Sequence, residues 1–131
     1  FPEENEKVFR YAAVKINILC RYLEKNKVKF SLVIIPYEIQ VSTDAADTYR
    51  KKNINWERGF EKGSAQVAII PNLEKKVRYY DALHAFVDRR EKALVGAYYV
   101  YNKGDKIDWN HPNREGHRLI AEYLVKKHIL Q

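Results

Sequence analysis

The hydrophobic positions of the chain change from a helical to a strand-like spacing within its first forty residues. Apolar residues recur at intervals of three and four between Glu3 and Lys25, which predicts an amphipathic helix with Val8, Ala12, Ile16, Leu19 and Leu23 on its apolar face. The run from Phe30 to Ile35 is almost continuously apolar and ends at Pro36, a pattern typical of a strand buried on both faces of a parallel sheet. A helix followed by such a strand predicts an α/β fold in which the helix covers one face of the sheet.

The rest of the chain continues this order of helices and strands. The further predicted elements are a helix over 44–52 capped by Ser42 or Thr43, helical stretches over 57–62 and 64–73 disturbed at their end by Pro71, a strand over 77–80, a helix that begins at Asp81, and a last helix capped by Asn113. His84 lies within the penultimate helix, and we interpret it as a surface histidine. The aromatic segment 94–101 is expected to pack in the core, with a cleft wall or a sheet edge as the alternative. No repeat or long linker divides the sequence, so we expect residues 1–131 to form a single domain or part of one.

Charge and composition narrow the classes of partner. The net charge of the 131 residues is +7, but the densest basic group, over 75–92, is interleaved with acidic residues. We therefore expect a solvated surface of mixed sign and no specific nucleic-acid partner. No apolar run is long enough to span a membrane. The single cysteine, Cys20, lies in the first apolar helix, where a buried and unreactive thiol is expected.

The block from Asp108 to His117 carries the candidate chemistry. Asp108 precedes His111 by three residues, a compact arrangement in which a carboxylate orients an imidazole that serves as a general base. Pro112 favours an extended conformation for the histidine, so His111 is expected just before the last helix. Gly116 falls on the third position of that helix, where a missing side chain allows close approach of another backbone or a ligand, at a propensity cost of about 1 kcal/mol.

This block resembles the closing sequence block of the SGNH (GDSL-type) hydrolases. The matching positions are Asp108, His111, Pro112, Asn113, Gly116 and His117, followed by an amphipathic last helix. The resemblance implies a three-layer fold with a parallel sheet sandwiched by helices, as in flavodoxin-like proteins. It also implies that Asp108 and His111 belong to a Ser-His-Asp triad that hydrolyses a small ester or an acetylated carbohydrate or lipid, without a cofactor or metal.

The chain departs from the family in the blocks that supply the nucleophile and the oxyanion donors. The family's Gly-Asp-Ser block is not present, and the only serines are Ser31, Ser42 and Ser64. The sequence begins at Phe1 in place of a methionine, so we expect an incomplete domain whose N-terminal part supplies the serine and is its principal partner. The isolated chain is predicted to be inactive.

The segment after the first strand is the candidate substrate-binding element. Functional loops in open α/β sheets leave the carboxyl ends of the strands, which places Tyr37, Glu38 and Gln40 on the expected active face. In the resembled family a loop at this position often lines the substrate cleft. The alternative is an ordinary polar exit from a strand.

Two alternatives to the catalytic interpretation of the Asp-His block remain open. Asp105, Asp108, His111 and His117 could ligate a metal such as zinc, although their spacing is not that of a tight ligand pair. The block could also be a structural turn in which Asp108 caps and His111 packs. A binding or interaction module on the same scaffold is the alternative to an enzyme, and a Gly-Asp-Ser sequence upstream would discriminate between them.

Overall fold

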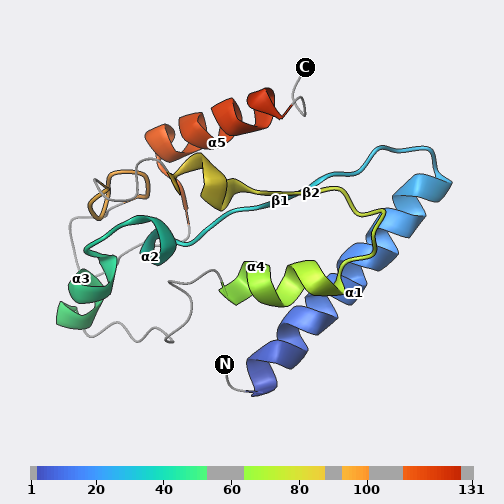
Figure 1. The fold of residues 1–131 in the computed structure, drawn as a ribbon, viewed down its shortest axis with the longest axis horizontal. Coiled ribbons are helices and arrows are strands. Elements are labelled where there is room, and N and C mark those ends of the chain that lie inside the picture. The colour runs from blue at the N-terminus through green and yellow to red at the C-terminus, as the bar shows by residue number, and fades with distance from the viewer. Residues whose placement is uncertain (1–2, 53–63, 88–92, 101–110, 128–131) are drawn as a thin grey trace.

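The computed structural model describes residues 3–52, 64–87, 93–100 and 111–127, and these form a mixed α/β structure (Figure 1). The elements in chain order are α1 (Glu3–Lys25), β1 (Leu32–Ile34), α2 (Glu38–Val41), α3 (Ala45–Lys51), α4 (Ser64–Ile69), the 3-10 helix η2 (Ile70–Asn72), β2 (Tyr79–Asp81), the 3-10 helix η3 (Ala82–Ala85) and α5 (Arg114–Lys126). None of the described helices is both long and apolar enough to cross a bilayer.

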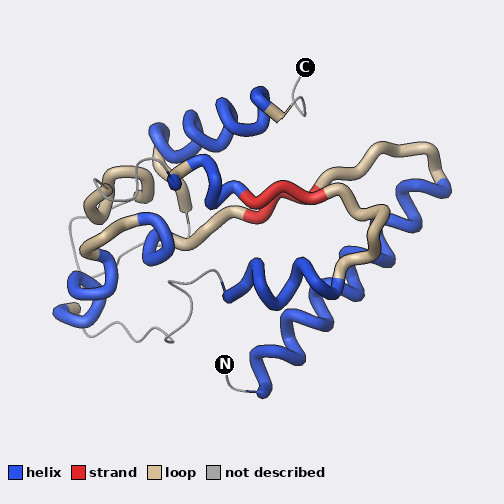
Figure 2. The backbone as a smooth tube through the Cα atoms, viewed as in Figure 1, coloured by secondary structure: helices blue, strands red, loops and turns tan. Residues whose placement is uncertain are grey.

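The sheet confirms the predicted parallel pairing of strands. β1 and β2 lie side by side in parallel, with Leu32 opposite Tyr79 and Ile34 opposite Asp81, and Figure 2 shows them at the centre of the molecule. Within the described residues the sheet contains these two strands alone. Figure 1 shows α5 on one side of the strands and α1 with α4 on the other.

The main hydrophobic core lies where α5 packs over η3 and the end of β1. Its buried residues are Val41, Ala82, Phe86, Tyr99, Leu119 and Ile120. Phe86 is fully enclosed, and the centroid of its ring lies 5.4 Å from that of Tyr98. A second, smaller cluster of Ile39, Ala45 and Tyr49 joins α2 to α3. These two clusters fix the elements that flank the turn before α5.

Helix α1 has the predicted bounds but a different buried face. Ala13, Asn17 and Cys20 are buried, whereas Val8 and Leu19, expected to face the sheet, are 62% and 45% exposed. The reason is that α1 packs mainly on α4 and η2.

The contact between α1 and η2 includes polar groups. The Asn17 side chain donates to the carbonyl of Asn72 at 3.0 Å and accepts from the backbone N–H of Glu74 at 2.9 Å. This contact fixes the chain just after Pro71. The proline lies in the 3-10 helix η2, which follows the end of α4 at Ile69, as its missing N–H and fixed φ predict.

Candidate functional site

The turn before α5 is held by backbone hydrogen bonds that begin at the carbonyl of His111, whose side chain is exposed. The carbonyl of His111 accepts a hydrogen bond from the N–H of Val100 at 3.0 Å, and Pro112 forms an antiparallel bridge with Tyr99. One residue later the N–H of Asn113 donates to the carbonyl of Tyr98 at 2.8 Å. Pro112 is buried, as this pairing requires, and the imidazole is placed on a fixed backbone at the protein surface.

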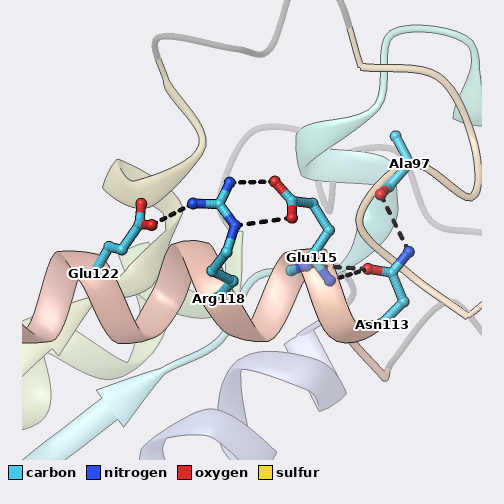
Figure 3. A network of polar contacts seen from close by, with 6 residues as sticks. Ala97, Asn113, Glu115, Arg118 and Glu122 are labelled. Carbon is cyan, nitrogen blue, oxygen red and sulfur yellow. Dashed lines mark hydrogen bonds and ion pairs between the residues drawn. The ribbon is translucent and has the colours of Figure 1, made fainter.

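Asn113 fastens α5 to the segment 94–100 with one side chain. Its Oδ1 accepts from the N–H groups of Glu115 at 2.9 Å and Gly116 at 3.0 Å, which confirms the predicted N-cap. Its Nδ2 donates toward the carbonyls of Gly96, Ala97 and Tyr99 at 3.0 to 3.1 Å. Figure 3 shows the amide between Ala97 and the first turn of the helix. The helix start and the facing loop are therefore held by the same amide group.

Gly116 explains how closely the helix can approach that loop. A Cβ at this position would lie 2.2 Å from the carbonyl oxygen of Tyr98 and 2.9 Å from the Cβ of Pro112. Both distances are far inside van der Waals contact, so a side chain would displace the backbone that holds His111. The close approach expected from the sequence is an approach of backbone.

The outer face of α5 carries a short ion-pair network. Arg118 lies between Glu115 and Glu122, with its Nε donating to Glu115 at 2.9 Å (Figure 3). A surface hollow of about 770 Å³ is lined by Asn113, Arg114, Glu115 and Arg118, which follow directly on the His111 turn. The residues that line this hollow carry both signs of charge and follow His111 closely in the sequence.

A buried carboxylate connects the loop to α2 and α3. Glu38 is 1% exposed, and it accepts hydrogen bonds from the Tyr49 hydroxyl and from the N–H of Gly96, each at 2.7 Å. Burial raises the pKa of this carboxyl, and the two donors partly offset the effect. Burial and the neighbouring Glu38 also raise the pKa of the Tyr49 hydroxyl.

Gly96 connects the buried Glu38 to the cap residue Asn113. It has a φ of 83°, a left-handed conformation that favours glycine. Its N–H reaches Glu38, and its carbonyl accepts from Asn113 at 3.0 Å. A continuous chain of hydrogen bonds thus runs from Tyr49 to the cap of α5.

Further polar contacts fix the ends of the same loop. Asp44 accepts from the N–H of Val95 at 2.8 Å and occupies the N-cap of α3, where Ser42 or Thr43 was predicted. The hydroxyl of Tyr99 donates to the carbonyl of Pro36 at the end of β1. The aromatic segment is therefore largely a core and loop-fixing element, in agreement with the simpler expectation.

The segment after β1 differs from the expected open loop. Residues 38–41 form the short helix α2, and Gln40 is buried with Oε1 accepting from the Tyr37 N–H at 2.8 Å. Gln40 also donates through Nε2 to Gln66 of α4 at 3.1 Å, and Gln66 is buried with no partner for its own Nε2 among the described residues. Glu38 and Gln40 therefore face the interior, and Tyr37 is half-buried.

The proposed partner of His111 lies outside the described residues, because Asp108 falls within 101–110. Its predicted hydrogen bond to Nδ1 of His111 stays a prediction. Asp105, a member of the alternative metal set, lies in the same range, and His117 is exposed on α5. The described residues contain no group of three or more potential metal ligands.

No protein-family model matches the sequence, and neither the curated proteins nor the solved structures include a significant match. The functional interpretation is therefore carried by the residues and geometry described above.

Three structural roles were not evident from the sequence. They are the Nδ2 contacts of Asn113, the hydrogen bond between Glu38 and Tyr49, and the link through Gly96. All three connect positions 11 to 58 residues apart. The signal for the first was present, since an asparagine that caps a helix has a free amide to offer a facing loop. The other two depend on tertiary packing that periodicity does not encode.

Proposed function

We propose that this chain is the C-terminal portion of an SGNH-type serine ester hydrolase, with His111 as general base and Asp108 as the residue that orients it. The observation that carries the proposal is an exposed His111 side chain at the start of a turn whose backbone is hydrogen-bonded to the facing loop from the His111 carbonyl to the Asn113 N–H. A general base must be held within hydrogen-bond reach of its proton, so rigidity of the backbone with access to the imidazole favours catalysis over packing.

The chemistry requires a serine from a part of the protein outside this sequence. His111 Nε2 accepts the proton of the serine hydroxyl as its oxygen attacks the ester carbonyl, and returns it to the leaving alcohol as the acyl-enzyme forms. Water then repeats the cycle and releases the acid. Asp108 accepts the Nδ1 proton and stabilises the imidazolium, while oxyanion donors from the missing part stabilise the tetrahedral intermediate.

In the proposed domain, β1 and β2 are two strands of a larger parallel sheet between layers of helices. The all-parallel pairing and the helices on both sides support this three-layer arrangement. A small ester or an acetylated carbohydrate or lipid would bind at the carboxyl end of the sheet. Tyr37 is the best placed of the predicted substrate contacts, because it is half-buried while Glu38 and Gln40 are enclosed and hydrogen-bonded internally.

The test is turnover of p-nitrophenyl acetate by the natural protein that includes the serine-bearing part. His111→Ala is expected to lower kcat by at least about a thousandfold, and Asp108→Asn by a smaller factor, because the latter removes tautomer control but not the base. His117→Ala is the matched control, since this histidine is also exposed on the same block, and its turnover should be unchanged.

The 131-residue chain alone provides the second arm. It should show no turnover above a His111→Ala control, because nucleophile and oxyanion donors are absent from it. Turnover by the isolated chain, or labelling of Ser31, Ser42 or Ser64 by a fluorophosphonate, would contradict the proposal. Unchanged turnover in the longer protein after His111→Ala would reject it outright.

A further inference from the structure

Helix α1 is apolar on two opposite faces. Ala13, Asn17 and Cys20 face the protein, but a second stripe on the other side of the helix is exposed to solvent. Its six large side chains are between 45% and 64% exposed, and they are Val8, Tyr11, Val14, Ile18, Leu19 and Tyr22. With 3.6 residues per turn, these positions occupy about 140° of the helix circumference. A surface helix normally has a single apolar stripe that faces the protein, so a second stripe exposed to solvent is unusual.

The exposed area of the stripe matches that of the largest apolar patches on ordinary monomers, and such patches often mark interaction sites. Six half-exposed large side chains expose roughly 600 Å², the upper limit of the largest apolar patch on an ordinary monomer. That area approaches the ~800 Å² that each side contributes to a stable interface. Neither of the two hydrophobic clusters of the described residues includes a residue of α1.

The two-stranded sheet is also incompletely covered. β1 has the composition of a strand buried on both faces, yet its residues are only half-buried, and Ile35 at its end is 46% exposed. Parallel sheets occur almost only with both faces covered, and stable sheets usually have more than two strands. Within the described residues both outer edges of the β1–β2 pair lack a neighbouring strand.

Charge argues against a second copy as the occupant. Lys15 lies within the stripe, with Nζ 4.9 Å from the centroid of the Tyr11 ring, and helical geometry places exposed Lys7 and Lys25 along its margin. A two-fold interface would bring this same basic patch against itself. An occupant with an apolar surface and an acidic margin would complement the patch.

We propose that the exposed stripe of α1 is the docking surface for the rest of one α/β domain, a polypeptide segment that also adds at least one parallel strand to the sheet. The inference rests on the proposed function for the identity of this segment, which is the part of the protein that carries the serine. Packing of the segment on α1 covers the stripe, and its strand covers an open edge of the sheet.

Cysteine labelling tests the docking surface directly. In a Cys20→Ala background, which removes the only cysteine, Ile18→Cys places a thiol on the stripe and Arg10→Cys places one on the exposed polar side of the same helix. In the 131-residue chain both thiols should react quickly with a maleimide. In the natural protein that includes the serine-bearing part, the Ile18→Cys thiol should react at least about tenfold more slowly. The Arg10→Cys thiol should react at an unchanged rate.

The outcomes separate this inference from the proposed function. Serine-dependent turnover with full reactivity at Ile18→Cys keeps the function and overturns the docking surface. Protection without serine-dependent turnover keeps the docking surface and rejects the function. Protection of Ile18→Cys in the 131-residue chain, caused by raised protein concentration or by vesicles of phosphatidylcholine and phosphatidylserine, would identify a second copy or a membrane as the occupant and overturn the inference.

Discussion

Replacing Asn113 tests the geometry that holds the candidate base in place. Alanine removes the N-cap, which contributes about 1 kcal/mol, and the donor to three loop carbonyls. The Nδ2 group has two hydrogens for three acceptors, so we count two net bonds at about 1 kcal/mol each. Asn113→Ala should therefore lower the free energy of unfolding by about 3 kcal/mol.

Asn113→Asp divides this loss into its two parts. The carboxylate keeps the cap to the N–H groups of Glu115 and Gly116 but offers no donor to the loop, and it places a negative charge beside the carbonyls of Gly96 and Tyr99. A loss of about 2 kcal/mol or more is expected at neutral pH. Urea unfolding monitored by circular dichroism measures both variants. A stability of Asn113→Asp equal to that of the unmodified chain would show that the asparagine is a simple helix cap and that its Nδ2 contacts do not hold the loop.

Two further variants probe the surroundings of the same turn. Gly116→Ala should destabilise the chain by about 1 to 3 kcal/mol in urea melts, because the clash with the Tyr98 carbonyl outweighs a propensity gain of about 1 kcal/mol. Ala121→Gly on the exposed side of α5 should cost only about 1 kcal/mol. A stabilised Gly116→Ala would contradict the close approach. Burial raises the pKa of Glu38 above its unfolded value, so its contribution to stability is fully present below the unfolded pKa near 4.5 and is lost as pH rises through the folded pKa. Glu38→Gln keeps a hydrogen-bond partner for Tyr49 and should reduce the fall in unfolding free energy between acidic and neutral pH, measured by urea melts. An unchanged fall would show that another group is responsible.

The elements that depend on local chemistry were predictable from the sequence. The bounds of α1, the parallel strand before Pro36, the break at Pro71 and the cap at Asn113 follow from periodicity, fixed φ angles and side-chain hydrogen bonding within a few residues. Gly116 also behaved as its position predicted, because a glycine inside a helix generally marks a close approach.

The features that depend on distant packing were not predictable in the same way. The face of α1 that is buried depends on where α4 and η2 lie, and a helix with apolar residues on more than one side gives no single choice of face. Glu38 follows a strand end and looks like a surface residue in sequence, but the hydroxyl of Tyr49 and the N–H of Gly96 allow its burial. Tyr49 lies 11 residues and Gly96 58 residues further along the chain, beyond the reach of a local pattern.

The most direct test of the central claim is the tautomer of His111 in the 131-residue chain, measured by long-range proton–nitrogen correlation spectroscopy on the neutral imidazole. Exposed His84 and His117 provide the internal reference, since an unconstrained imidazole prefers its proton on Nε2. We predict that His111 carries its proton on Nδ1, because Asp108 accepts it and leaves Nε2 free to receive the proton of a serine. Asp108→Asn should shift His111 to the reference behaviour. A His111 that carries its proton on Nε2 in the unmodified chain, and that does not respond to Asp108→Asn, would contradict the catalytic pair.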